Sequence, residues 1–151
     1  MSGVSKAIVQ PLLSWYDAGH RDLPWRSEPA PYRVWVSEIM LQQTRVEAVR
    51  GYFSRWMNAL PDIPALAAAD EAVYTKLWEG LGYYSRVRNL HRAAVLLCEE
   101  YGGELPADYD RLLALPGVGE YTAGAVASIA FGLPVPAVDG NVLRLAARIT
   151  G

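Results

Sequence analysis

Residues 112–127 read LLALPGVGEYTAGAVA, and this stretch decides which fold we expect. Two short helical patterns flank a Pro-Gly-Val-Gly turn at 116–119, and the second pattern is rich in Ala and Gly, which is typical of a helix-hairpin-helix. Glycines allow such a turn to adopt positive φ and let the backbone approach a ligand, while the second helix begins with free N–H groups. The tip therefore favours phosphate binding through backbone amides. The alternative is an ordinary helical hairpin whose small residues only permit close packing.

Apolar residues recur at helical spacing on both sides of this hairpin, and no stretch predicts a convincing strand. The prolines between 23 and 31 are expected to exclude regular structure until about Tyr32. Asp70 and Ser85 are plausible helix N-caps. The sequence thus predicts an all-α fold with helices over about Val4–Ala18, Tyr32–Gln43, Arg45–Leu60, Pro64–Ala69, Asp70–Gly80, Ser85–Tyr101, Asp108–Ala114 and Tyr121–Phe131, and from Asp139 onward.

The composition is that of a compact globular protein. A chain of 151 residues with 52% hydrophobic and 20% charged residues fits one domain, or one domain plus part of another, and excludes intrinsic disorder. Its single cysteine, Cys98, excludes a disulfide scaffold and any multi-cysteine metal site within the chain. No apolar run approaches the roughly 18–20 residues of a membrane span, and residues 1–6 lack the apolar stretch of a signal peptide. We therefore expect a cytoplasmic location.

The net charge of −2 argues against a broad basic surface for nucleic acid. Twelve of the fourteen basic residues are nevertheless arginine, which suits bidentate phosphate contacts. The cluster of Arg86, Arg88, His91 and Arg92 lies mostly along one side of a predicted helix, where a solvated face is the plainer interpretation. A hairpin that holds phosphate through backbone amides would reconcile DNA binding with the negative charge.

Glu38 stands out within the helix predicted over 32–43. Val34 and Trp35 lie one turn before it and Leu41 one turn after, and no Arg or Lys stands three or four positions away. Desolvation without a cationic partner raises the pKa of a carboxyl group and favours the protonated acid near neutrality. The alternative is a glutamate paired with an arginine from elsewhere in the fold.

Asp139 precedes the last predicted helix in the stretch VPAVDGNV at 135–142, where its position is that of an N-cap. A carboxylate in that role stays ionised, and its remaining lone pairs are free to face a developing cation. The structural and the catalytic interpretation are therefore compatible.

Four motifs occur together and in order: VSEIMLQQT at 36–44, GLGYYSR at 80–86, LPGVG at 115–119 and VDGNV at 138–142. In these motifs and their spacing the chain resembles MutY-type adenine DNA glycosylases of the helix-hairpin-helix base-excision repair superfamily, from about Trp15 onward. The resemblance implies a six-helix barrel domain over 22–134, with the helix-hairpin-helix at about 108–131. Residues 1–21 and 135–151 would then belong to a second domain that carries an iron–sulfur cluster.

The resemblance also implies a monofunctional enzyme that removes adenine mispaired with 8-oxoguanine or guanine by cutting the N-glycosidic bond. The target base must leave the stack to be reached, so it would be flipped into a pocket. By the resemblance Glu38 protonates adenine at N7 and Asp139 stabilises the oxocarbenium-like sugar, while Tyr121 and Asn141 assist. This division resembles glycoside hydrolysis, in which one carboxyl group is protonated and the other ionised.

Further roles are carried over from the same family. Gln42, Gln43, Thr44 and Tyr83 would enter the duplex and contact the lesion strand, although a capped helix end and a core tyrosine are the alternatives. The hairpin residues Gly117, Val118 and Gly119 would hold phosphate. The wall of the adenine pocket would comprise Arg21, Trp25, Arg26 and Leu41, unless the proline-rich turn merely packs its Trp on the core.

Members of the family carry a [4Fe–4S] cluster held by four cysteines after the aspartate helix, followed by a domain that reads 8-oxoguanine. This chain ends at Gly151 and Cys98 lies in the wrong region, so we expect the cluster in the full-length protein and no metal ligands in this chain. Whether residues 1–151 are active alone stays open. The expected partner is double-stranded DNA containing an adenine mispair, bound by a monomer without membrane contact.

Two other functions remain. An endonuclease III-type glycosylase with lyase activity shares the hairpin, but its chemistry needs a lysine nucleophile just after it. Here Glu120 and Tyr121 occupy that place, and the only lysines are Lys6 and Lys76. The second alternative is a DNA-binding fragment without catalysis, which would bind a duplex but release no base.

Overall fold

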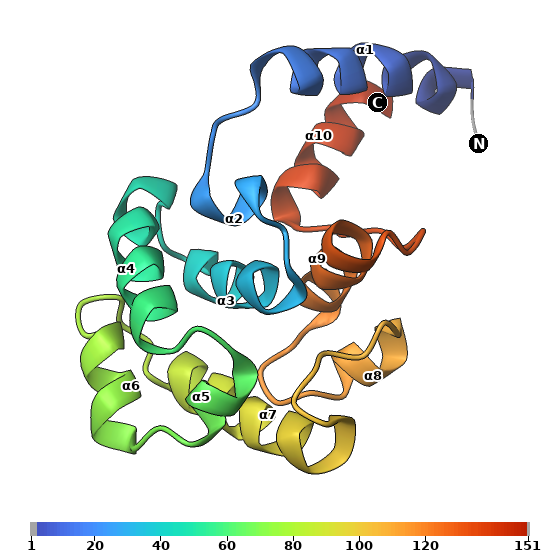
Figure 1. Cartoon of the computed structure of the whole chain (residues 1–151). Helices are drawn as coiled ribbons and strands as arrows, with labels where there is room; N and C mark the ends of the chain where they lie inside the picture. Colours follow the sequence, from blue (N-terminus) through green and yellow to red (C-terminus); the bar gives the residue numbers. More distant parts are fainter. Residues whose placement is uncertain (1–2, 151) are drawn as a thin grey trace.

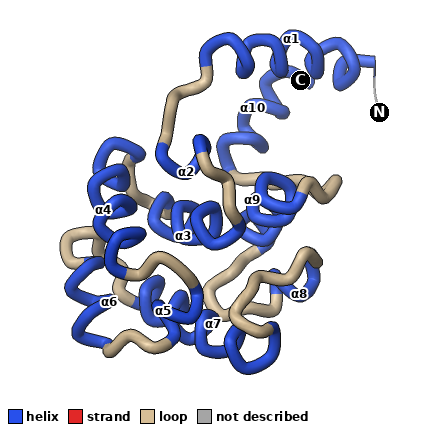
Figure 2. Tube along the Cα trace, viewed as in Figure 1, coloured by secondary structure: helices blue, strands red, loops and turns tan. Residues whose placement is uncertain are grey.

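The computed structural model describes residues 3–150 and the side chains from residue 6 onward, so Met1, Ser2 and Gly151 lie outside the described residues. Within this part of the chain all regular structure is helical, which confirms the predicted all-α class (Figures 1 and 2). The helices are α1 (Gly3–Gly19), α2 (Pro24–Ser27), α3 (Pro31–Leu41), α4 (Val46–Ala59), α5 (Ile63–Ala67), α6 (Glu71–Trp78), α7 (Ser85–Tyr101), α8 (Tyr109–Leu113), α9 (Glu120–Phe131) and α10 (Gly140–Thr150).

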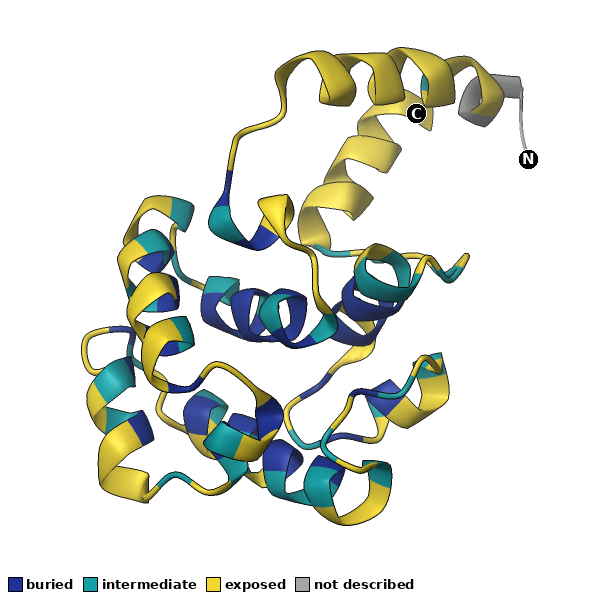
Figure 3. Cartoon of the chain, in the orientation of Figure 1, coloured by how far each residue is buried: buried dark blue, intermediate teal, exposed yellow. Residues whose placement is uncertain are grey.

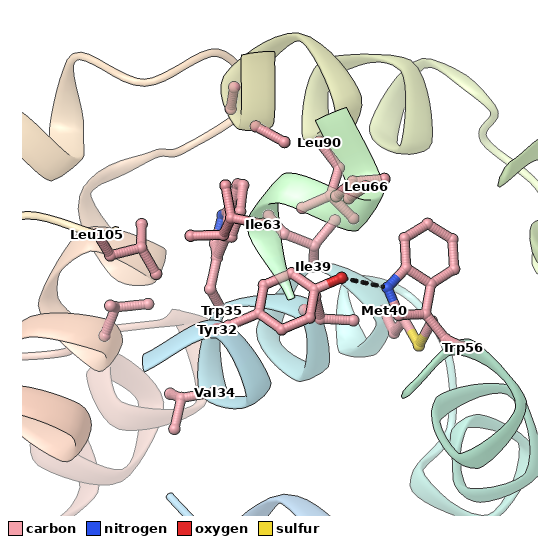
Figure 4. Close-up of a cluster of buried hydrophobic side chains, with 14 of the residues drawn as sticks. Tyr32, Val34, Trp35, Ile39, Met40, Trp56, Ile63, Leu66, Leu90 and Leu105 are labelled. Carbon is pink, nitrogen blue, oxygen red and sulfur yellow. Dashed lines mark hydrogen bonds between the residues drawn. The ribbon is translucent and has the colours of Figure 1, made fainter. Parts of the chain in front are cut away.

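Helix α3 lies at the centre of the body and packs against α4 and α9, while α5 packs against α7 (Figure 1). It is apolar on most sides, so seven of its residues are buried, as expected of a helix enclosed by its neighbours. Polar atoms inside this core are paired. The Tyr32 hydroxyl donates to the Leu60 carbonyl at 2.8 Å and accepts from Trp56 Nε1 at 3.0 Å, a bond drawn in Figure 4. The central helix is thereby held by both packing and hydrogen bonds.

Helices α1 and α10 lie beside the rest of the body and are almost entirely exposed (Figure 3). Both present apolar side chains to solvent, among them Trp15 of α1 and Leu143 of α10, which are 67% and 62% exposed. This separation is compatible with domain boundaries near residues 22 and 134, which stay a prediction. No helix between residues 3 and 150 is long and apolar enough to cross a membrane.

The region predicted to be irregular was partly misjudged. Pro24–Ser27 form a single helical turn with proline at its first position, where the missing N–H costs nothing, and α3 likewise starts at Pro31. The prolines therefore begin helices here instead of excluding them.

Of the two predicted N-caps, Asp70 is confirmed by its position and Ser85 is wrong by one residue. Tyr84 and not Ser85 precedes the first residue of α7, and Asp70 precedes α6 without a side-chain capping bond. The aspartates that do cap helices with their side chains include Asp62 and Asp108, which accept from the backbone N–H three residues on at 2.8 and 2.9 Å.

Candidate active site

A pocket of about 660 Å³ opens between α2, α3, the start of α9 and the segment that leads into α10. We call it the carboxylate pocket because it contains Glu38 and Asp139. It gathers side chains from distant parts of the sequence, including every residue predicted for catalysis and for the adenine wall. Its lining comprises Tyr16, Arg21, Leu23, Trp25, Arg26, Val34, Ser37, Glu38, Leu41, Gln42, Gln43, Val46, Tyr121, Ile129, Asp139 and Asn141.

Glu38 lies on the face of α3 that borders this pocket. Burial raises the pKa of its carboxyl group above the ordinary value, and a nearby Asp139 charge adds to the shift. Hydrogen bonding from Tyr121 and the charge of Arg26 act in the opposite direction but do not cancel it. None of the ion pairs between described residues involves Glu38. The side chain is therefore the desolvated carboxyl group that the sequence predicted. The charge of Arg26 lowers its pKa somewhat, but the two side chains form no ion pair.

Asp139 caps α10 at the mouth of the pocket. Its Oδ1 accepts from the backbone N–H of Val142 at 2.8 Å and of Asn141 at 3.0 Å, while Asn141 Nδ2 donates to Oδ2 at 3.0 Å. The Val142 bond is the leading reason that the pKa of Asp139 lies below its ordinary value, and Asn141 and the charge of Arg144 lower it further. The carboxylate is thus ionised and oriented by the helix end, as predicted for an N-cap.

Tyr121 stands in the first turn of α9 and lies near both carboxyl groups. Burial, followed by the charges of Glu38 and Asp139, raises the pKa of its hydroxyl to about 12. The phenol therefore keeps its proton at neutral pH and acts as a hydrogen-bond donor. Tyr121 therefore brings a hydroxyl donor from the helix that follows the hairpin close to Glu38.

The position of Asp139 depends on a close approach between α9 and the segment before α10. A Cβ atom at Gly124 would lie 2.2 Å from the Pro136 carbonyl oxygen and 3.2 Å from Ala137 Cα. Only glycine leaves room for the backbone to pass at this point, so Gly124 sets the path of the chain three residues before the carboxylate. In the sequence, Gly124 is only one of the small residues of the second hairpin helix, and this close approach is not predicted.

The hairpin has the predicted shape with one correction. Gly117 has a φ of +75°, and a Cβ there would lie 2.8 Å from Asn89 Cβ, so glycine is required for the turn and for its packing on α7. Gly119 has a φ of −94°, which any residue adopts, so its predicted need for positive φ was wrong. A Cβ at Gly119 would meet nothing within 4 Å, so the space beside this helix start is open to a ligand.

The residues predicted to enter a duplex lie on one edge of the molecule, at the end of α3 and before α7. Gln42 follows α3 and donates from Nε2 to the Thr122 hydroxyl of α9 at 3.3 Å, and Gln42 and Gln43 line the carboxylate pocket. Thr44, Tyr83 and the hairpin glycines do not line it. Tyr83 is 64% exposed, which excludes the core-tyrosine alternative.

Two residues of the site were missed or misread from the sequence. Tyr16 of α1 lines the pocket and lies 5.6 Å beneath the Arg26 guanidinium, a placement that helical periodicity alone does not reveal. Arg86 was read as part of a solvated face, but its guanidinium is turned inward onto backbone carbonyls of two loops. The signal available was its position in the GLGYYSR motif, directly after a glycine-rich turn.

Trp25 combines both roles considered for it. It is 6% exposed and packs edge-on against Phe53, with ring centroids 5.3 Å apart, yet it also lines the pocket. The proline-rich turn therefore anchors its Trp on the core and presents one side of it to the cavity.

The described residues do not fit an iron–sulfur cluster. Among residues 3–150 no group of three or more His, Cys, Asp or Glu is placed to hold a metal ion. The chain has one cysteine, Cys98, whereas a [4Fe–4S] cluster is bound by four thiolates.

The family model described as "HhH-GPD superfamily base excision DNA repair protein" matches residues 36–151. This chain belongs to that family. The HhH-GPD match includes the whole hairpin and those residues of the carboxylate pocket that follow residue 35.

Curated relatives are identical to this HhH-GPD chain at about half of the aligned positions. Proteins named adenine DNA glycosylase are 51% identical over 147 residues in Mus musculus, 50% over 147 in Homo sapiens and 47% over 138 in Mycolicibacterium smegmatis. Each comparison covers 91% of this chain, but only 28%, 27% and 47% of the respective relative. The chain therefore spans between about a quarter and a half of the length of these relatives.

Solved structures of the family agree in fold. A thermostable thymine-DNA glycosylase superposes with a TM-score of 0.88 at 29% identity, covering 94% of this chain and 66% of that one. A non-covalent endonuclease III–DNA complex gives 0.82 at 26% identity, covering 97% and 68%. The predicted helix-hairpin-helix glycosylase fold is confirmed by this similarity.

Proposed function

We propose that this chain carries the active site of a monofunctional adenine DNA glycosylase, which hydrolyses the N-glycosidic bond of adenine mispaired with 8-oxoguanine or guanine. One observation carries the proposal: a desolvated carboxyl group with a raised pKa shares a pocket with an ionised, helix-capped carboxylate. The similarity to proteins named adenine DNA glycosylase, at 47–51% identity, supports the choice of base.

In the proposed mechanism adenine leaves the base stack and enters the carboxylate pocket. Glu38 is protonated because burial raises its pKa, and it transfers this proton to N7 of the base as the glycosidic bond breaks. Protonation turns a poor leaving group into a good one. Tyr121, which keeps its own proton, hydrogen-bonds Glu38 and keeps the carboxyl group directed into the pocket.

Breaking the bond leaves positive charge on the sugar, and Asp139 is proposed to stabilise it. Two backbone N–H groups and the Asn141 amide hold the carboxylate before the reaction starts, so no reorganisation is needed as charge develops. Water then attacks the sugar and passes a proton to Glu38, which gave up its own to the base, so that free adenine and an abasic site result. The base itself would lie against Arg21, Trp25, Arg26 and Leu41.

The duplex is proposed to lie across the edge formed by the hairpin and the two loops that carry Gln42–Thr44 and Tyr83. Backbone amides at Gly117–Gly119 would bind a phosphate, which needs no basic surface and suits the net charge of −2. Tyr83, exposed and aromatic, and the Gln42 and Gln43 amides suit insertion beside the extruded base.

The lyase alternative finds no nucleophile in the pocket. Neither of the two lysines lines it, and Lys76 is an exposed α6 residue paired with Glu79. Glu120 and Tyr121 stand at the start of α9. Schiff-base chemistry requires an amine at the sugar, so hydrolysis without strand cleavage is the better proposal. A non-catalytic binding fragment would not require two carboxyl groups in opposite protonation states within one pocket.

We further propose that the protein is a monomer in the cytoplasm and functions together with a [4Fe–4S] cluster, which the single cysteine of residues 1–151 cannot hold. Visible absorbance and iron content of the full-length protein test the cluster. Sedimentation tests the oligomeric state, and cell fractionation tests the location.

The function is tested by single-turnover assays of the protein on duplexes that contain adenine opposite 8-oxoguanine, with thymine opposite 8-oxoguanine as the control. We expect free adenine from the first duplex, none of the corresponding base from the second, and strand cleavage only after alkali. Release of thymine would contradict the proposed specificity for adenine. Strand cleavage with a borohydride-trappable intermediate would contradict the proposal and favour an endonuclease III-type lyase.

A further inference from the structure

Arg86 joins two loops that are far apart in sequence. Its Nη1 donates to the carbonyl of Ile39 at 2.9 Å, to that of Met40 at 3.3 Å and to that of Gln42, all at the end of α3. Its Nη2 donates to the carbonyls of Leu81 at 3.2 Å and Gly82 at 3.3 Å, in the turn before α7. One guanidinium therefore satisfies carbonyls at a helix end and in a neighbouring turn.

Two aromatic rings hold the guanidinium in place. Its central carbon lies 5.3 Å from the Trp78 ring centroid and 5.6 Å from that of Tyr83. Trp78 is fully buried, and its Nε1 donates to the Gly82 carbonyl at 3.0 Å. Arg86 thus lies between a rigid core side chain and the exposed Tyr83 ring.

The two loops share an uncommon backbone feature. Among the described residues, the non-glycine residues with positive φ are Gln43 at 60° and Tyr83 at 48°. Each directly follows a residue whose carbonyl accepts from Arg86, namely Gln42 and Gly82. Strained conformations of this kind persist where surrounding contacts over-determine them, and here one side chain supplies contacts to both.

We propose that Arg86 is a positioning residue that locks the Gln42–Thr44 loop and the Gly82–Tyr83 turn into one rigid edge, so that both enter a mispaired duplex together. The inference rests on the proposed function for its DNA readout, but the coupling of the loops stands on the contacts of Arg86 alone. Arg86 touches neither the base nor the sugar in this account and acts only through the two loops.

Substitutions separate its hydrogen bonds from its bulk. Arg86→Met keeps a long apolar stem against Trp78 but removes every donor. Arg86→Lys keeps the charge and three donors, which cannot reproduce the planar fork that reaches two loops. Arg92→Met is the matched control, because Arg92 is an exposed arginine on the same helix.

The loop coupling is tested by amide hydrogen exchange in the purified protein. We expect residues 41–45 and 80–84 to exchange faster together in Arg86→Met and, to a lesser degree, in Arg86→Lys, and neither to change in Arg92→Met. Acceleration of only one loop, or of neither, would overturn the inference. If Arg86→Met does not fold, Arg86→Lys decides the question by the same criterion.

The consequence for DNA is tested by comparing affinities for a mispaired and a fully paired duplex. Because both inserting loops lose their fixed geometry, we expect the ratio of the two affinities to fall at least about tenfold in Arg86→Met, with partial recovery in Arg86→Lys. Affinity for the paired duplex should stay within about twofold, because the hairpin binds phosphate independently of these loops. A parallel loss on both duplexes, or an unchanged ratio, would overturn the inference.

The same experiments keep this inference distinct from the proposed function. Wild-type protein that released no adenine would contradict the function, whatever Arg86 does to hydrogen exchange. An active wild type whose discrimination survives Arg86→Met would contradict the inference alone.

Discussion

Glu38 and Asp139 belong to one pocket but are held in opposite protonation states by different local causes. Burial on α3 disfavours the charge of Glu38, whereas helix capping at α10 favours the charge of Asp139. Since each cause is local to one residue, each can be removed by an isosteric substitution without rebuilding the pocket.

Glu38→Gln should change how stability depends on pH. The folded protein keeps the Glu38 proton to higher pH than the unfolded chain, so the free energy of unfolding of the wild type falls as pH rises from the ordinary pKa of 4.5 through the raised folded value. Glutamine lacks this term, so the variant should gain stability relative to wild type across that window and show no such trend below it. Denaturant titrations at a series of pH values measure the difference.

The control for this titration is Glu47→Gln, because the Glu47 side chain is 74% exposed and lies outside the pocket. It should run parallel to the wild type. A wild-type curve parallel to that of Glu38→Gln would show that Glu38 is not desolvated in the folded protein.

Asp139→Asn should abolish most activity and leave the fold intact. Asparagine is as good an N-cap as aspartate, so α10 keeps its start, but the charge that would face the sugar cation is lost. We expect single-turnover adenine release to fall by about 10²–10³-fold with little change in duplex affinity. Asp62→Asn, which alters a comparable cap on α5, should retain activity. Near-normal release by Asp139→Asn would exclude the residue from the mechanism.

For single residues, the sequence predicted the protonation states of the two carboxyl groups better than it predicted which side chains are in contact. Glu38 and Asp139 were found because the sequence indicates part of what shifts their pKa values, namely the apolar residues one turn from Glu38 and the position of Asp139 directly before a helix. Arg86 and Tyr16 were misread or missed because their partners lie far away, with Arg86 contacting carbonyls up to 47 positions distant.

The hairpin and the segment that follows α9 are the elements that place the site. The hairpin turn leads into α9, and the space beside Gly119 at its tip is open. Helix α9 then places Tyr121 in the pocket and Gly124 against the backbone of Pro136. Residues 122–127 are all buried. Helix α9 therefore packs in the core and also contacts the segment that leads to Asp139.

Gly117→Ala and Gly119→Ala should have different effects although they are two residues apart. Alanine at 117 meets positive φ and the Asn89 side chain, so we expect a loss of at least about 1 kcal/mol in the free energy of unfolding. Alanine at 119 meets neither, so stability should change by less than about 1 kcal/mol while affinity for all duplexes falls alike. Thermal unfolding and duplex titrations measure both. Loss of affinity for the mispaired duplex alone would instead make the hairpin a lesion reader.

Gly124→Ala should impair catalysis from a distance. The added Cβ would lie 2.2 Å from the Pro136 carbonyl oxygen, so the segment must move and take Asp139 with it. A displacement of about 1 Å at a catalytic group costs on the order of a hundredfold in rate, and we expect adenine release to fall by that amount while duplex affinity holds. Gly51→Ala is the matched helical control, since only a flexible Arg55 side chain is near. Unimpaired release would remove this positioning role.

Element boundaries were predicted to within a few residues where the apolar period is strong, as for α7 at Ser85–Tyr101. The short α2 was missed because four residues carry no helical period, and proline at a first helical position is easily mistaken for a breaker. The φ of Gly119 was misjudged because glycine permits positive φ without requiring it.

In the whole molecule, the carboxylate pocket is lined by residues of α2, α3 and α9 and also by Tyr16 of α1 and Asn141 of α10. Helices α1 and α10 lie together beside the body of α2–α9 (Figure 1). The all-α class and the order of the longer helices follow from the sequence, because each of these helices has its own apolar period. The meeting of Tyr16, Glu38 and Asp139 does not, because it depends on how the helices pack and on the path that Gly124 allows.

The central claim is that Glu38 supplies the proton that releases adenine. It is tested most directly by the single-turnover rate of adenine release from an adenine–8-oxoguanine duplex by wild type and Glu38→Gln at matched, saturating occupancy. We predict a loss of about 10²–10⁴-fold in this rate with unchanged duplex affinity, because glutamine fills the same space but has no proton to transfer. Release by Glu38→Gln within a few-fold of wild type would contradict the account.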